Sequence, residues 1–139
     1  MNKPYTLLDH TADLRVCITG KSMTALFENA GLALADLICD PGTLTSTQTV
    51  SIDVTGDDPA DLMVNFLREL LYLWTGKEKL VKMVSIDDIS NTALSAVIAA
   101  SNYNSRHHTI LNEIKAVTYH QIRVTPTARG WQATVVLDI

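Results

Sequence analysis

The chain has 139 residues, of which 47% are hydrophobic and 19% are charged, and its formal net charge is −4. This length supports one hydrophobic core, so we expect a single folded domain over residues 1–139. The acidic balance disfavours a protein that holds nucleic acid through phosphate contacts, which require clustered Lys and Arg. No apolar run approaches the roughly 18 residues that cross a bilayer, and the N-terminal residues lack the apolar core of a secretion signal. We therefore expect a cytoplasmic protein.

The first elements predicted along the chain are a strand and a helix. Apolar and polar residues alternate at 14–19, which indicates a half-buried strand. Ser22 is a suitable N-cap for the helix that follows, and apolar residues recur at three- and four-residue spacing to about residue 38. Asp40-Pro41-Gly42 ends this helix.

A second strand and a second helix follow. Residues 50–55 alternate as a strand does. Asp58 can cap the next helix, Pro59 suits its first position, and Asp61 lies in the first turn, where the helix dipole favours an anion. Gly76 is a natural end for this helix.

The rest of the chain is predicted to form strands. Residues 83–89 and 92–99 form one expected hairpin, and residues 116–124 and 131–138 form another. The strand at 92–99 is apolar on both faces, which indicates a central position, whereas 109–117 also fits a helical turn. We expect the α+β class: two helices packed on one face of a mostly antiparallel or mixed sheet, in a single two-layer domain.

Common catalytic signatures are missing from the sequence. It contains no P-loop, GxGxxG, GxSxG or HExxH motif. Cys17 and Cys39 lie among apolar neighbours without a CxxC partner, so we expect buried, reduced thiols. The pair His107-His108 lies in a polar segment and is interpreted as part of an exposed loop rather than as a metal site.

Two short acidic segments are candidates for a cation site. Asp9-His10-Thr11-Ala12-Asp13 precedes the first strand, and its local alternative is a turn with an Asx-type hydrogen bond. The predicted last strand runs to Asp138-Ile139. If the first and last strands are antiparallel neighbours, Asp13 lies close to Asp138, and their carboxylates repel each other unless a cation lies between them.

A lysine at the start of the 116–124 strand is a third candidate. Lys115 directly precedes apolar residues of that strand. The simplest interpretation is a residue that faces solvent. Alternatively, it presents a positive charge to a phosphate or to a carboxylate of a partner.

Four segments together resemble the archease family. They are DHTAD at residues 9–13, ELLY in the helix that carries Leu67–Tyr72, KAVTYH at residues 115–120, and VLDI at residues 136–139. Their order and spacing match the family over essentially the whole chain. Arg68 departs from the family, which usually has Asn at this position, and the loop at 101–109 also differs.

The resemblance implies a function that residue patterns do not show. Archeases are α+β proteins that bind a divalent cation, usually Ca²⁺, with Mg²⁺ as the alternative here. They serve the GTP-dependent RNA ligase of tRNA splicing and RNA repair, which joins 3′-phosphate or 2′,3′-cyclic-phosphate ends, by promoting its guanylylation and repeated turnover. The implied metal ligands are Asp13, Asp138 and the main-chain oxygen of Ile139, and Lys115 matches a lysine linked to activation. We thus expect an accessory protein and not an enzyme, which contacts RNA only indirectly.

Two other functions stay open at this point. One is a metal-dependent phosphoester hydrolase that uses Asp13 and Asp138, with His10 as base. The other is a general chaperone or RNA-binding adaptor, although the acidic composition disfavours direct RNA affinity.

Overall fold

The computed structural model describes residues 3–10, 13–45 and 48–139, and for residues 8–10 it describes the backbone alone. The helices are α1 (Met23–Ile38) and α2 (Pro59–Thr75), with a short 3-10 helix, η1 (Pro41–Thr43). The strands are β1 (Tyr5–His10), β2 (Asp13–Gly20), β3 (Gln48–Thr55), β4 (Lys79–Ile89), β5 (Ala93–Asn102), β6 (Ala116–Thr127) and β7 (Gly130–Asp138). The sequence predicts both α-helices and every strand except β1, but it does not predict η1, which lies in the segment expected to end the first helix.

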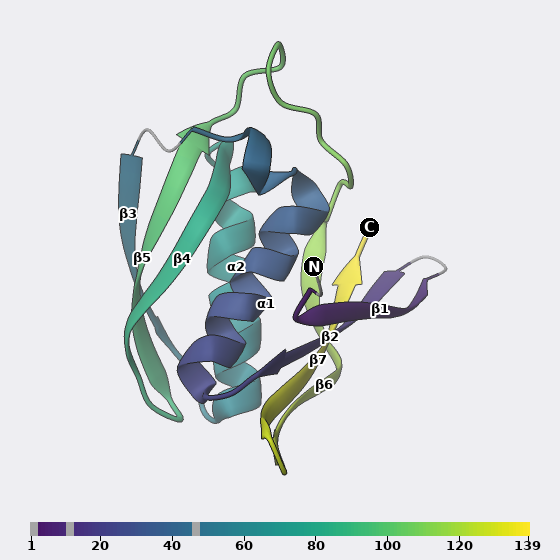
Figure 1. The fold of residues 1–139 in the computed structure, drawn as a ribbon, viewed down its shortest axis with the longest axis vertical. Helices are drawn as coiled ribbons and strands as arrows, with labels where there is room; N and C mark the ends of the chain where they lie inside the picture. The colour runs from purple at the N-terminus through teal and green to yellow at the C-terminus, as the bar shows by residue number, and fades with distance from the viewer. Residues whose placement is uncertain (1–2, 11–12, 46–47) are drawn as a thin grey trace.

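The strands form two antiparallel sheets with both helices between them (Figure 1). The four-stranded sheet has the order β1-β2-β7-β6, and the three-stranded sheet has the order β3-β5-β4. Both helices contact both sheets, α1 through β2 and β4 and α2 through β6 and β3. The α+β class and the antiparallel pairing are confirmed. The structure differs from the expectation in having two sheets, so the helices are covered on two sides.

The distribution of buried residues on the helices explains the second sheet. Leu62, Met63 and Val64 are consecutive in α2 and all are buried, and the same holds for residues 33–35 of α1. Three consecutive helical residues span more than half of the helix circumference, so one sheet cannot cover them. The spacing of apolar residues in the sequence predicts a single apolar stripe on each helix, and hence a single sheet.

The predicted helix caps are present. The Ser22 hydroxyl accepts a hydrogen bond from the main-chain N–H of Ala25 at 3.1 Å. The Asp58 carboxylate accepts one from the N–H of Asp61 at 2.8 Å, and Pro59 occupies the first turn of α2. Each cap satisfies an N–H group that has no partner within its helix and fixes where the helix begins.

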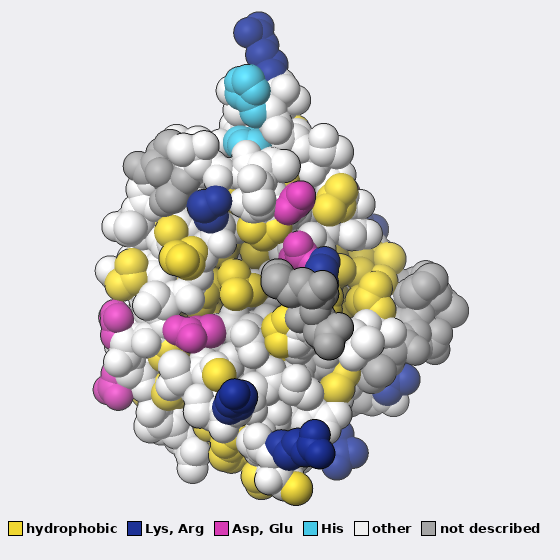
Figure 2. Space-filling view, viewed as in Figure 1, with side chains coloured by type: hydrophobic (Ala, Val, Ile, Leu, Met, Phe, Trp, Pro, Cys, Tyr) yellow, Lys and Arg dark blue, Asp and Glu magenta, His cyan; other side chains and the backbone are white. Residues whose placement is uncertain are grey.

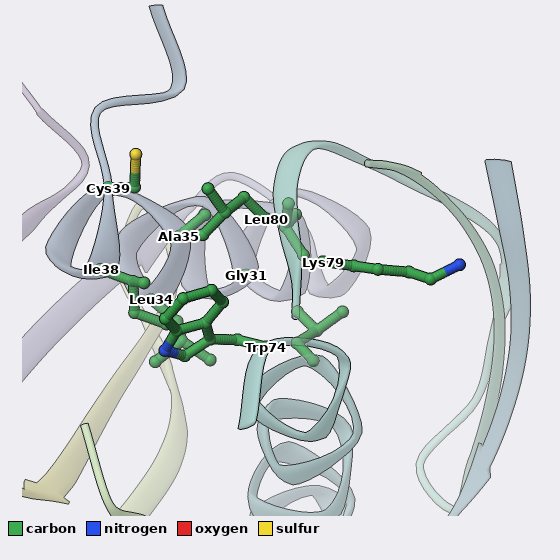
Figure 3. A pocket seen from close by; sticks show the side chains of 10 residues that line it. Gly31, Leu34, Ala35, Ile38, Cys39, Trp74, Lys79 and Leu80 are labelled. Carbon is green, nitrogen blue, oxygen red and sulfur yellow. The ribbon is translucent and has the colours of Figure 1, made fainter. Parts of the chain in front are cut away.

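The core lies where the helices meet each other and the sheets. The Phe27 and Phe66 rings pack across the helix pair, with their centroids 5.8 Å apart. A small apolar gap of about 10 Å³ lies near the C-terminal ends of both helices (Figure 3). Trp74 lies over this gap, whereas Lys79 extends away from it and donates to Gln48 at 2.6 Å. The volume of the gap is that of one water molecule, so the gap is a packing defect and not a ligand site.

The predicted hairpins are confirmed, and β5 is the central strand of its sheet. The ambiguous segment before β6 is irregular. It is attached to the end of α1 by hydrogen bonds from the Leu111 N–H to Ile38 O at 2.7 Å and from the Asn112 amide to Leu37 O at 2.7 Å. In the described part of the chain, neither helix is long and apolar enough to cross a membrane.

Candidate metal site

The pairing of β2 with β7 places Asp13 directly opposite Asp138. Side chains of directly opposite residues in an antiparallel pair project from the same side of the sheet, with Cβ atoms about 4.5–5.5 Å apart. The next pair, Leu14 and Leu137, is buried against the helices, so the two carboxylates lie on the outer side of the sheet. Asp13 is half-exposed and Asp138 is exposed. The first strand predicted from the sequence (β2) and the last one (β7) are thus antiparallel neighbours, which is the condition for Asp13 to lie close to Asp138.

The start of β6 completes this end of the sheet. Ala116 pairs with Asp138 on the side away from β2, so the side chain opposite Asp138 on that strand is a small methyl group. The main-chain N–H of Lys115 donates to the main-chain oxygen of Asp138 at 2.7 Å, while the Lys115 side chain is exposed. Ile139 is half-buried and packs against the core. The fold thus brings together the four residues that the resemblance singles out.

The donor groups at this end of the sheet suit a hard divalent cation. Carboxylate and main-chain oxygens are the ligands that Ca²⁺ and Mg²⁺ prefer, and a cation offsets the repulsion between the two facing carboxylates. Among the described residues, His, Cys, Asp and Glu side chains form no group of three or more that could hold a metal ion by themselves. A cation bound by Asp13 and Asp138 would need further ligands, and main-chain oxygens and water molecules are of the type that these cations accept.

Part of the N-terminal motif cannot be placed in this site. Thr11 and Ala12 lie outside the described residues, and so do the side chains of Asp9 and His10. The β1–β2 register places the backbone of Asp9 opposite Arg15 and that of His10 opposite Leu14. The proposed role of His10 as a base therefore stays a prediction.

Arg15 is a neighbour of the site that the sequence analysis did not single out. It follows Asp13 on the outer side of β2 and lies opposite Val136 of β7. Its Nε is buried and has no hydrogen-bond partner among the described residues. Within the described residues, the Arg15 guanidinium makes no ion pair with Asp13 or Asp138. The signal in the sequence was the alternation of β2, which puts residues 13 and 15 on one face.

The second half of the KAVTYH segment is attached to α2. The register of β6 against β7 shifts between Thr118 and Arg123, and Tyr119 lies within this irregularity. Its hydroxyl donates to the Asp61 carboxylate at 2.8 Å and lies 3.2 Å from the side-chain oxygen of Asn65. These contacts hold the irregular part of β6 against the first turns of α2.

Arg68 supports the same attachment. Its Nε donates to the main-chain oxygen of Val117 at 3.1 Å, and its guanidinium lies over the Tyr119 ring, 4.6 Å from the centroid. A guanidinium stacked on an aromatic face makes a favourable cation–π contact. Arg68 therefore has a structural role, which is to hold β6 on α2.

The charges of this network affect two pKa values. The pKa of Asp61 is lowered from its ordinary value of 3.8, because the main-chain N–H of Asp57 and then the Tyr119 hydroxyl stabilise its ionised form. The pKa of Tyr119 is raised from 10.0, mainly because its hydroxyl donates to Asp61. Both groups therefore stay in the protonation states that favour the hydrogen bond at neutral pH.

The histidine pair lies in the loop between β5 and β6. His108 accepts a hydrogen bond from the N–H of Asn104 at 2.9 Å, and His107 is exposed. Figure 2 shows histidine side chains at the upper end of the molecule, on this projecting loop. This placement agrees with a solvent-exposed loop. The thiols agree in part with expectation, since Cys39 is buried and Cys17 is half-buried, and both are free.

A family model and individual relatives that are similar to this chain point to the same family. The model of the Archease protein family matches residues 5–139. The protein archease of Methanosarcina acetivorans is 36% identical, with 99% of this chain and 97% of the relative covered. The protein archease of Archaeoglobus fulgidus is 31% identical, with 97% and 98% covered. The names of these relatives state no enzymatic activity.

Two solved structures have the same fold. The solution structure of Methanobacterium thermoautotrophicum protein 1598 has a TM-score of 0.81 at 24% identity and covers 99% of this chain and 100% of its own. A Thermotoga maritima crystal structure, described as an archease and possible chaperone, has a TM-score of 0.65 at 22% identity, with 100% and 98% covered. At these identities the structural likeness supports the fold alone.

Proposed function

Because the chain belongs to the archease family, we propose that it is a metal-binding accessory protein that activates a GTP-dependent RNA ligase. The observation that carries the proposal is the β2–β7 register, which places Asp13 opposite Asp138, with Lys115 beside them at the same end of the sheet. The proposed ligands are Asp13, Asp138 and the main-chain oxygen of Ile139, and the proposed cation is Ca²⁺, with Mg²⁺ as the alternative. The proposed location of the protein is the cytoplasm.

The two aspartates and the lysine have different tasks in this proposal. A bound divalent cation would supply positive charge at the end of the sheet and would hold its ligands in fixed positions. Asp13 and Asp138 hold that cation, because their carboxylates face each other on two strands whose positions are fixed by the pairing. Lys115 is fixed through its main-chain bond to Asp138, while its exposed ammonium is free to meet a phosphate or a carboxylate of the ligase.

This arrangement suits an activator that acts on a partner. Lys115 and Asp138 are exposed and Asp13 is half-exposed at this end of the sheet, so a partner surface has access to them. Positive charge brought to the guanylylation centre of the ligase stabilises charge that develops on the phosphates during GMP transfer. Docking at that centre also favours the ligase conformation that is competent for transfer.

The test is ligase guanylylation with and without this protein, at substoichiometric amounts. We expect faster transfer of GMP to the ligase and more than one ligation per ligase, both reduced in the Asp13→Asn variant. The protein alone is assayed against phosphoesters in parallel. Hydrolysis by the isolated protein would favour the hydrolase alternative. Equal protection of unrelated unfolded proteins, with no effect on guanylylation, would favour a general chaperone.

A further inference from the structure

A solvent-open groove of about 770 Å³ lies at the far end of the four-stranded sheet. It is formed where β2 leads into α1 and where β6 turns into β7. The β2–β7 pairing runs from Asp13 opposite Asp138 to Gly20 opposite Trp131. Seven steps along a strand correspond to about 23 Å, so the groove is separate from the candidate metal site.

Two tightly packed turns place a basic residue on each wall of this groove. Gly130 has a φ of +146°, and a Cβ atom there would overlap the main-chain oxygen of Gly20 and lie 2.9 Å from Lys21 Cα. The β6–β7 turn therefore packs on the β2–α1 turn backbone to backbone, which a larger residue at position 130 would prevent. Lys21 and Arg129, next to these glycines, are consequently held on neighbouring turns.

The groove is positively charged although the whole protein is acidic. Lys21 and Arg129 line it, and none of its lining residues is a carboxylate. Among the described residues, neither of these two cations has an acidic partner within salt-bridge distance. In Figure 2, Lys and Arg side chains gather at the lower end of the molecule, near the β6–β7 turn. Their charge is thus available to a ligand.

An aromatic side chain adds a second kind of contact. Trp131 lines the groove and is partly exposed. The neighbouring amides are already engaged, because the Asn29 amide donates to Thr19 O at 2.8 Å and the Gln132 amide donates to Cys17 Sγ at 2.9 Å. The groups left for a ligand are two cations and an indole, the combination that binds the phosphates and the bases of single strands.

We propose that this groove binds a short segment of single-stranded nucleic acid, with phosphates at Lys21 and Arg129 and a base against Trp131. The inference goes beyond ligase activation and does not rest on the metal site, since it concerns direct contact between this protein and a nucleic acid strand. With two phosphate contacts in an otherwise acidic protein, the binding is weak and depends on salt.

Fluorescence anisotropy of a labelled hexa-adenylate RNA, titrated with the full chain between 50 and 200 mM KCl, tests the proposal. Two phosphate contacts to a single strand predict a slope of log affinity against log salt of about −1.4, or about a sevenfold loss of affinity over this range. Lys21→Gln and Arg129→Gln should each halve the slope, to about a 2.6-fold loss.

The aromatic contact is tested with two substitutions at one position. Trp131→Leu should weaken binding at 50 mM KCl at least about fivefold without changing the slope, since stacking contributes about 1–3 kcal/mol per base. Trp131→Phe retains an aromatic face and should keep most of the affinity. Thermal melts of both variants show whether a loss reflects unfolding.

The matched control is Lys77→Gln, which removes one positive charge after the C-terminal end of α2, outside the groove. It should leave affinity and slope unchanged. A loss equal to that of Lys21→Gln would show binding through overall charge and would overturn the proposal. So would the absence of RNA binding at 50 mM KCl. Adenosine monophosphate that competes as well as the oligonucleotide would show a site for free nucleotides and would also overturn it.

Discussion

Replacing Asp138 by Asn should change the stability of the protein in opposite directions with and without a divalent cation. In the absence of a cation, the substitution removes the repulsion between two facing carboxylates. Directly opposite cross-strand pairs change the stability of a sheet by about 0.2–1 kcal/mol, and like charges in such a pair destabilise it. The main-chain bond from the Lys115 N–H to the oxygen of residue 138 is retained, because the backbone does not change. We therefore expect Asp138→Asn to be about 0.5 kcal/mol more stable than the wild type in EDTA.

With Ca²⁺ the order should reverse. A ligand at 100 times its Kd stabilises the folded state by about 2.7 kcal/mol, and at ten times its Kd by about 1.4 kcal/mol. If the loss of one charged ligand weakens binding tenfold, Ca²⁺ stabilises the variant by about 1.3 kcal/mol less than it stabilises the wild type. The variant then becomes about 0.8 kcal/mol less stable than the wild type at the same Ca²⁺ concentration.

Urea denaturation in EDTA and in Ca²⁺ measures both differences. Asp87→Asn is the matched control, because Asp87 is an exposed residue of β4 in the other sheet and loses the same charge. It should behave like the wild type in both conditions. A wild type that gains no stability from millimolar Ca²⁺ or Mg²⁺ would refute the cation site. A variant less stable than the wild type in EDTA would refute the repulsion on which the reasoning rests.

Three further predictions concern the surroundings of the site. Asp13→Asn should weaken Ca²⁺ binding at least tenfold in calorimetry, or about 1.4 kcal/mol, and an unchanged affinity would remove Asp13 from the ligands. Lys115→Ala should keep the melting temperature of the wild type, because the side chain is exposed, while ligase guanylylation decreases; a lower melting temperature with normal activation would make Lys115 a structural residue. Tyr119→Phe should raise the pKa of Asp61 toward 3.8 in an NMR titration, because a donor to the carboxylate is lost. A carboxyl group whose pKa is lowered in the folded state stabilises the fold at pH values above its ordinary pKa, and this stabilisation disappears as the pH falls through the lowered pKa. The variant should therefore be less stable than the wild type at neutral pH but not in strong acid. A stability difference that stays constant with pH would contradict the assignment.

The local elements of this fold were predictable because their signals are local. The caps at Ser22 and Asp58 depend on side chains within three residues of the N–H groups they satisfy. The two hairpins join neighbouring strands through short turns, and the alternation of each strand identifies its buried face. The residues that resemble the archease family were also visible as four short segments, which gave the candidate ligands before any geometry was known.

Long-range pairing was decided by the tertiary structure. The sequence predicts that Asp13 lies close to Asp138 if the first and the last predicted strands pair. The pairing itself joins residues 125 positions apart and depends on the whole core. The second sheet likewise follows from burial on two sides of each helix, which a single apolar stripe does not indicate. The attachment of Tyr119 to α2 depends on an irregularity in β6. The groove between Lys21 and Arg129 depends on two turns that pack together although they lie more than 100 residues apart in the chain. Composition reports the average charge of the chain, whereas the fold determines where the charges gather.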